Sequence, residues 1–351
     1  MRDTRDVRPS RDPRDKRDTR DQRDSRAPYS PANRSAPSGP AAPRELEAPA
    51  PQPPRPPQRP KQPPPPPRPL DLKLAGASPI LPPPDFAAKA LEYHIELEPH
   101  ELEPLGRFLA MVLAANESMN LTSIDDPAHA WTRHVLDSLS LVQVLAELPA
   151  GARVIDVGTG GGFPGIPLAI IFPKLNFTLL DATAKKIEFL KQAAQALGLT
   201  NVQAIASRAE ALAHDRGTRL TGLAAKNAPV TPGRAPRQNA HREAYDLVIA
   251  RAVGPMATLA ELTIPFAKPP ERETETPGGV IALIKGQKAG EELEAASKAI
   301  KLLGGFYEQT IPTPTGQIVL ITKINPTNRI YPRADGEPKR SPLGIGSSQK
   351  E

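Results

Sequence analysis

The residues best suited to chemistry are glycines that directly follow a short apolar run. Residues 154–157 read Val-Ile-Asp-Val, and Gly158, Gly160 and Gly162 follow at alternate positions. Glycine lacks a Cβ, so a turn of this kind lets a ligand approach the backbone closely. The helix expected next, over 166–171, would offer unpaired N–H groups at its start. The spacing therefore predicts a strand, a glycine turn and a helix start that together bind a cofactor.

One interpretation of these glycines is a dinucleotide site. Gly160, Gly162 and Gly165 satisfy G-x-G-x-x-G, and Asp181 lies 21 residues beyond Gly160. This spacing meets the fingerprint for a nicotinamide cofactor. A nicotinamide-dependent oxidoreductase is therefore one alternative.

Two details favour S-adenosylmethionine instead, and the third apparent match to a dinucleotide site is neutral. Asp156 lies two positions before Gly158, where a carboxylate would repel a pyrophosphate but attract a sulfonium and an amino group. Pro164 and Pro167 crowd the helix start, which suits a wide glycine turn better. Asp181 can accept from the ribose hydroxyls of any adenosine cofactor, so it does not discriminate. We therefore expect Asp156, Gly158, Gly160, Gly162 and Asp181 to bind S-adenosylmethionine.

Strand and helix patterns alternate around this turn. Their order predicts a doubly wound, mainly parallel α/β sheet of Rossmann-like type, closed by an antiparallel edge at its C-terminal end. The expected strands cover 154–157, 177–180, 202–205, 246–249 and 280–284, with a hairpin over 306–311 and 318–322. The expected helices cover 166–171, 185–197, 259–266 and 290–303.

Composition divides the chain into parts of different character. Residues 1–84 hold 24 of the 45 prolines and begin with repeated Arg-Asp pairs, which predicts a disordered arm. Apolar residues at helical spacing over 85–148 predict a helical subdomain, including one helix over 127–148. The methyltransferase body would cover 149–325, interrupted by a disordered insertion over 214–243 and followed by a basic tail over 326–351.

The basic charge belongs to the arm. Residues 1–70 carry 16 Lys and Arg against 9 Asp and Glu, a net charge of +7, whereas the whole chain carries +6. Such an arm suits weak contacts with RNA phosphates, a groove that binds proline-rich segments, or no partner at all. A non-enzymatic RNA-binding protein that works through its arm is thus another alternative.

Several classes of site are disfavoured by what the sequence lacks. There is no cysteine, so disulfides and a cysteine nucleophile are excluded. No His, Asp and Glu cluster has metal-ligand spacing, so we expect no metal. No apolar stretch reaches membrane-spanning length, and no signal peptide is evident. We expect a cytoplasmic protein without membrane contact, and a monomer.

Several motifs in order resemble the RsmG (GidB) family of bacterial 16S rRNA methyltransferases. The resemblance covers roughly residues 86–343. The matching segments are 120–124, 133–139, 156–165, 180–186, 207–210, 250–252, 285–286, 331–333 and 342–343. It implies transfer of a methyl group from S-adenosylmethionine to N7 of a guanine in the 530 loop of 16S rRNA, with the small ribosomal subunit as partner. The arm and the insertion are not part of the family pattern.

The resemblance also implies roles for individual residues. It places Gly158 and Phe163 at the methionine and adenosine of the cofactor, with Arg251 in the cleft shared by cofactor and substrate. It places Asp181, Ala182 and Thr183 at the ribose, and Ala209 and Glu210 at the adenine edge. A methyltransferase that acts on a small molecule is the remaining alternative.

The expected chemistry requires few catalytic residues. Guanine N7 carries a lone pair and no proton, so positioning and exclusion of water are sufficient and no general base is needed. Arg251, Lys185 and Arg208 are candidates for contacts with rRNA phosphates or the guanine O6 edge. Asn120 either orders a loop or contacts the base. For His134 we expect a structural role, with Asp137 as its hydrogen-bond partner.

Overall fold

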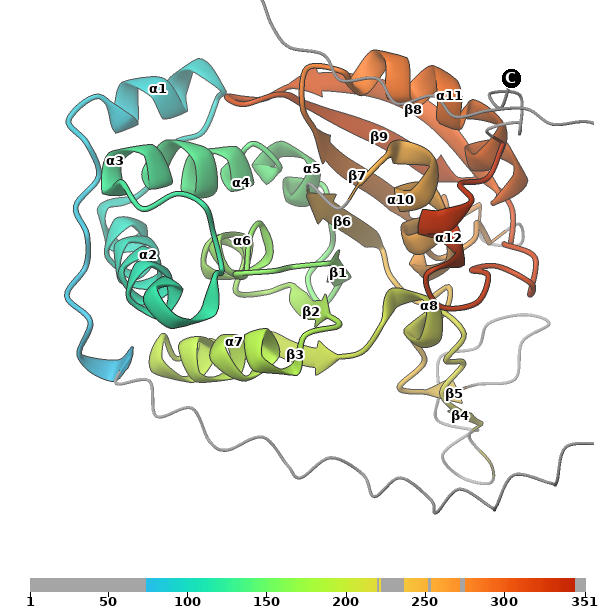
Figure 1. Ribbon diagram of the computed structural model, residues 1–351, viewed down its shortest axis with the longest axis horizontal. Helices are drawn as coiled ribbons and strands as arrows, with labels where there is room; N and C mark the ends of the chain where they lie inside the picture. The colour runs from blue at the N-terminus through green and yellow to red at the C-terminus, as the bar shows by residue number, and fades with distance from the viewer. Residues whose placement is uncertain (1–73, 220, 222–236, 252–253, 272–274, 345–351) are drawn as a thin grey trace, which may run out of the picture. The chain divides into compact units, whose positions relative to one another are not determined.

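A seven-stranded sheet carries the predicted glycine turn (Figure 1). The computed structural model describes residues 74–219, 221, 237–251, 254–271 and 275–344. The strands are ordered β3-β2-β1-β6-β7-β9-β8. Their bounds are β1 Arg153–Val157, β2 Asn176–Asp181, β3 Val202–Ala206, β6 Leu247–Arg251, β7 Val280–Lys285, β8 Gly305–Pro312 and β9 Gln317–Lys323. Neighbouring strands from β3 to β7 are parallel, while β9 is antiparallel to β7 and β8. The predicted Rossmann-like sheet with an antiparallel C-terminal edge is confirmed.

Helices cover both faces of this sheet. Their bounds are α6 Gly165–Ile171, α7 Ala184–Ala196, α8 Ala209–Leu212, α10 Met256–Thr263 and α11 Ala289–Leu302. Alternate strand residues point to opposite faces. Val154 and Leu179 accordingly belong to one buried cluster, with α6 and α7, while Ile155 and Leu180 belong to the other, with α10 and α11. Burial on both faces explains why these strands read as continuous apolar runs.

The N-terminal helices share the first of these clusters. They are α1 Phe86–Glu92, α2 Pro99–Met119, α3 Pro127–Ala130, α4 Asp137–Leu139 and α5 Val142–Ala146. Leu109, Trp131 and Leu139 pack in the same core as Val154 and Leu179. The helical part therefore rests on one face of the sheet and has no separate core.

The single helix predicted over 127–148 is interrupted. Between α3 and α4 the chain forms a π-helical stretch, Trp131–Leu136, and a turn separates α4 from α5. Two serine hydroxyls donate to backbone carbonyls here, Ser138 to His134 at 2.5 Å and Ser140 to Asp137 at 2.6 Å. Serine side chains that compete for backbone groups, together with a π-bulge, explain the departure from a regular helix.

The packed structure begins within the segment predicted as an arm. A 3-10 turn, Leu74–Gly76, buries Leu74 in the core. Farther along, the Ile80 amide donates to the Gly106 carbonyl of α2 at 3.2 Å. A Cβ at Gly106 would lie 2.4 Å from the Ile80 carbonyl oxygen, so this close approach requires glycine. The disorder predicted for residues 1–73 lies outside the described residues.

The ends of the predicted insertion are ordered as well. A short antiparallel pair joins β4 Thr218–Arg219 to β5 Arg237–Gln238, and residues 222–236 lie outside the described part. Arg242 is buried, and its guanidinium donates to the carbonyls of Ala213, Thr327, Asn328 and Tyr331. This arginine therefore joins the insertion to the C-terminal segment. That segment includes α12 Glu337–Arg340 and packs on the body as far as residue 344.

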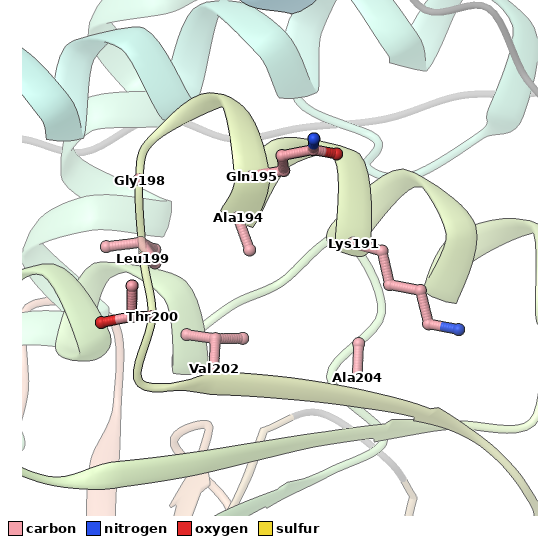
Figure 2. A pocket seen from close by; sticks show the side chains of 8 residues that line it. All are labelled: Lys191, Ala194, Gln195, Gly198, Leu199, Thr200, Val202 and Ala204. Atoms are coloured by element: carbon pink, nitrogen blue, oxygen red, sulfur yellow. The ribbon is translucent and has the colours of Figure 1, made fainter.

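A pocket of about 400 Å³ lies away from the glycine turn, between the end of α7 and the edge strand β3 (Figure 2). Its lining includes Ala194, Leu199 and Val202, with Lys191 at one side. It contains none of the residues predicted to bind the cofactor. Among the described residues, no helix is long and apolar enough to cross a membrane.

Candidate functional site

The glycine turn joins β1 to α6 at the carboxyl end of the sheet. Gly158, Gly160 and Gly162 all have positive φ, of 77°, 58° and 96°. The amides of Gly158 and Thr159 donate to the Leu180 carbonyl of β2, which fixes the turn against that strand. A Cβ at Gly162 would lie 2.6 Å from Leu190 Cδ2, so this glycine is required for packing. A Cβ at Gly160 would have no atom closer than 3.9 Å, so the turn is open at this position.

Asp181 ends β2 beside this open position. Its Oδ2 accepts from the Gly160 amide at 3.1 Å, and its Oδ1 accepts from the Thr183 amide at 2.8 Å. Ala182 and Thr183 follow it with exposed side chains. Each carboxylate oxygen retains a lone pair, so Asp181 can still accept from two vicinal hydroxyls.

Asp156 is fully buried beneath the turn. Its Oδ2 accepts from the Gly165 amide at 3.0 Å, while its Oδ1 has no hydrogen-bond partner among the described residues. Burial raises the pKa of Asp156 to about 6. The buried Thr159 hydroxyl interacts with this carboxyl and partly opposes the rise of its pKa. A buried acceptor left unpaired is costly, and a positively charged group bound at the turn would relieve that cost.

Phe163 forms the wall next to the turn. Its ring stacks on His134, with centroids 4.6 Å apart, and contacts Phe108 with centroids 5.1 Å apart. The Arg251 guanidinium carbon lies 5.4 Å from the centroid of the same ring. The wall thus brings together residues from α2, the π-helical stretch, the glycine turn and β6.

Arg251 is the last residue of β6, whereas the predicted strand ended two positions earlier, at residue 249. Its Nη1 donates to the Arg133 carbonyl at 3.0 Å and to Asp137 Oδ2 at 3.4 Å. Burial lowers the pKa of Arg251, and the carboxylates of Asp137 and Asp156 oppose that shift. Its Nε and Nη2 make no hydrogen bond to the residues that the structure describes. Two donor groups thus remain for a ligand.

Arg208 and Glu210 face the C-terminal segment. Glu210 is buried, and its Oε1 accepts from the Gly336 amide at 2.8 Å. Arg208 forms ion pairs with Glu210 at 3.5 Å and with Asp335 at 3.3 Å. Ala209, between them, begins the short helix α8. Arg208 therefore has carboxylate partners within the protein.

The other predicted residues lie near the end of α2. The exposed Lys185 donates from Nζ to the Ser118 carbonyl at 3.1 Å. Asn120 caps α2 in the left-handed conformation, with φ 51° and an exposed side chain. The expected hydrogen bond between His134 and Asp137 is wrong. His134 Nε2 instead pairs with the Thr122 hydroxyl at 2.7 Å, because Asp137 lies on the side that faces Arg251.

The main omission from the sequence prediction is the environment of Asp137. Its Oδ1 accepts from the hydroxyls of Thr313 and Thr315 in the turn between β8 and β9. These threonines lie more than 170 residues away in sequence, so no local pattern connects them. One signal was available, because Asp137 lies in the segment 133–139 that matches the family. Among the described residues, no group of three or more His, Asp or Glu side chains could hold a metal ion.

The strand order, the antiparallel edge and the glycine turn flanked by two acids define a class I methyltransferase. The chain belongs to the rRNA small subunit methyltransferase G (GidB) family, whose model matches residues 101–317. The protein named ribosomal RNA small subunit methyltransferase G from Sorangium cellulosum is 42% identical over 271 residues, covering 77% of this chain and 96% of that protein. Its namesake from Moorella thermoacetica is 35% identical over 264 residues, covering 74% and 97%.

Among solved structures, a SAM dependent methyltransferase from Aquifex aeolicus is similar with a TM-score of 0.36 and 18% identity. That similarity covers 58% of this chain and 97% of that one.

Proposed function

We propose that this protein transfers the methyl group of S-adenosylmethionine to N7 of a guanine in the 530 loop of 16S rRNA. Membership of the rRNA small subunit methyltransferase G family supports the substrate class. The observation that carries the cofactor assignment is the unpaired, buried Oδ1 of Asp156 beneath an open glycine turn. A nicotinamide pyrophosphate would place negative charge next to this carboxylate, whereas a sulfonium cofactor brings positive charge.

The residues present fit this cofactor. Asp156 and the turn at Gly158–Gly162 would hold the methionine end, and Asp181, Ala182 and Thr183 would hold the ribose. Phe163 would cover one side. When bound, the cofactor supplies an electrophilic methyl group on a positively charged sulfur. Ala209 and Glu210 would contact the edge of the adenine ring, and the Gly336 amide keeps the Glu210 side chain in place.

The reaction requires no proton transfer by the protein. The N7 lone pair forms the new N–C bond, the S–C bond breaks, and its electron pair returns to sulfur. The positive charge thereby moves from sulfur to the guanine ring. What the protein supplies is alignment of donor and acceptor in a site that excludes water. The carboxylate of Asp137 beside Arg251 is therefore not needed as a base.

Arg251 is the residue that we propose to orient the guanine. Its Nε and Nη2 remain available, and arginine donors recognise the O6 edge of guanine well. Lys185 would contact rRNA phosphate from the rim of the site. Arg208 is a weaker candidate for such a contact because its ion pairs with Glu210 and Asp335 hold it on the protein. Asn120 would order the loop that follows α2.

The test is methyl transfer from labelled S-adenosylmethionine to small ribosomal subunits that lack the modification. Cleavage at N7-methylguanine then maps the product. We expect one labelled guanine in the 530 loop, and loss of labelling for Asp156→Asn. Glu337→Gln, which removes an exposed carboxylate remote from the turn, is the control that should label normally. Cofactor binding without labelling of subunits would contradict the proposed acceptor and favour a small-molecule substrate.

A further inference from the structure

The carboxylate of Asp137 connects three separate parts of the fold. It comes from α4, and its side chain is only 3% exposed. Its Oδ1 accepts from Thr315 Oγ1 at 2.5 Å and from Thr313 Oγ1 at 3.1 Å, both in the β8–β9 turn. Its Oδ2 lies 3.4 Å from Arg251 Nη1, at the end of β6. One buried group thus joins the helical part, the β8–β9 turn and the cleft.

A carboxylate this deeply buried requires a compensating charge, and Arg251 is its one cationic partner among the described residues. The two threonine hydroxyls fix Asp137 from the opposite side. The Arg133 carbonyl and the ring of Phe163 constrain the same guanidinium. The guanidinium of Arg251 is therefore fixed by hydrogen bonds at Nη1, and the ring of Phe163 contacts one of its faces.

The pairing also affects the charge of the cleft. Arg251 lies near enough to Asp156 for the two charges to influence each other. An uncompensated arginine at that position would weaken the attraction between Asp156 and a cationic ligand. With Asp137 beside it, the arginine contributes little net charge. Its free donors can then serve the site while Asp156 still attracts a cation.

We propose that Asp137 is a positioning residue: it fixes Arg251 and cancels its charge, so that a sulfonium cofactor binds beside an arginine. This inference rests on the proposed function for the identity of the cofactor. It does not depend on the identity of the methyl acceptor.

The test compares two ligands that differ in charge at sulfur. S-Adenosylmethionine carries a sulfonium, and S-adenosylhomocysteine lacks the transferred methyl group and has a neutral sulfur; the adenosine and amino-acid groups are the same. In Asp137→Asn we expect the dissociation constant for S-adenosylmethionine, measured by calorimetry, to rise about tenfold at low salt. For S-adenosylhomocysteine it should rise less than threefold. A purely structural role would weaken both ligands equally, and that result would overturn the proposal.

A double-mutant cycle tests whether Asp137 acts through Arg251. Once Arg251→Gln has removed the charge, adding Asp137→Asn should change the ratio of the two dissociation constants less than twofold. If Asp137→Asn changes this ratio as much in the Arg251→Gln background as it does in the wild-type background, the proposal is overturned. Thr315→Val is the matched control, because it removes a hydrogen bond to Oδ1 and keeps the ion pair. It should leave the ratio unchanged.

Methyl transfer separates this inference from the proposed function. If wild-type protein shows the expected ligand preference but does not label subunits, the acceptor is wrong and the role of Asp137 stands. If subunits are labelled and Asp137→Asn leaves the ligand ratio unchanged, the proposed function stands and the role of Asp137 is wrong.

Discussion

His134 stacks on Phe163, with ring centroids 4.6 Å apart and ring planes inclined by 19°. One edge of the histidine is fixed by the Thr122 hydroxyl, which pairs with Nε2 at 2.7 Å. The loop over 120–124 is thereby attached to the wall of the candidate site. Leu121 of this loop lies within 3.5 Å of the position that a Cβ on Gly161 would occupy. The loop, the histidine and the glycine turn are therefore one packed unit.

The first prediction concerns the ring of Phe163. Phe163→Ala should lower the free energy of unfolding by about 3 kcal/mol, because it removes a buried ring that three side chains contact. It should also weaken cofactor binding at least tenfold. Urea unfolding and calorimetry measure the two effects. Phe306→Ala is the control, since that ring is 52% exposed and remote from the turn. Equal effects of the two substitutions would contradict the proposed wall.

The second prediction is a pH dependence of stability. Burial lowers the pKa of His134 to about 4, from an ordinary value near 6.5. Between pH 6.5 and 4 the unfolded chain therefore binds a proton that the folded protein does not. The contribution of His134 to stability should fall as the pH falls through this window, by up to about 3 kcal/mol at the lower end. The raised pKa of Asp156 contributes in the opposite direction below pH 6, so the measurement is the difference between wild type and His134→Asn. The free energy of unfolding of wild type relative to His134→Asn should decrease from pH 6.5 to 4 in urea titrations. If the difference in free energy of unfolding between the two proteins does not change with pH, the lowered pKa of His134 is contradicted.

The third prediction is a pH dependence of cofactor affinity, set by Asp156. Burial raises the pKa of this carboxyl to about 6, so it is largely protonated below that pH. A sulfonium cofactor favours the ionised form, and binding near pH 6 should release a proton. The affinity should therefore decrease up to tenfold per pH unit below 6 and level off above it. Calorimetry in two buffers of different ionisation enthalpy would detect the proton. Asp156→Asn should bind weakly at every pH, without proton release.

Most of the scaffold could be predicted from local patterns. The run 154–157 and the glycines after it predicted a strand and a turn that the structure confirms, because strand ends and turns follow from short-range sequence. The interruption at Trp131–Leu136 was not predicted, because apolar spacing alone does not show that serine hydroxyls compete for the backbone. The contacts of Asp137 with Thr313, of Arg208 with Asp335 and of Glu210 with Gly336 were not predicted either, since each joins residues more than 110 positions apart in sequence.

The fourth prediction concerns the C-terminal segment. Arg333 donates to both carboxylate oxygens of Glu261, at 2.9 Å from Nε and 2.7 Å from Nη2, and Glu261 is fully buried. Arg333→Met should lower the free energy of unfolding by about 3–5 kcal/mol, because it leaves a buried carboxylate without its cation. Glu337→Gln removes the exposed partner of the same arginine and should cost less than about 1 kcal/mol. Thermal or urea unfolding of both variants measures this. Similar costs would show that Glu261 is stabilised by other means.

The last prediction separates the arm from the packed chain. Removing residues 1–73 should leave the unfolding midpoint and methyl transfer to isolated subunits within twofold of wild type, because the resemblance to the family begins beyond them. Removing residues 1–84 also deletes Leu74, which is buried, and Ile80, whose amide binds the Gly106 carbonyl. The longer deletion should therefore cost about 2–5 kcal/mol, comparable to deleting one large core side chain. Leu74→Ala in the full-length chain is the matched control and should account for much of that loss.

If the shorter deletion alone abolishes methyl transfer while the protein stays folded, the arm takes part in substrate binding. Its net charge of +7 over residues 1–70 would then point to contacts with rRNA phosphates, which added salt should weaken.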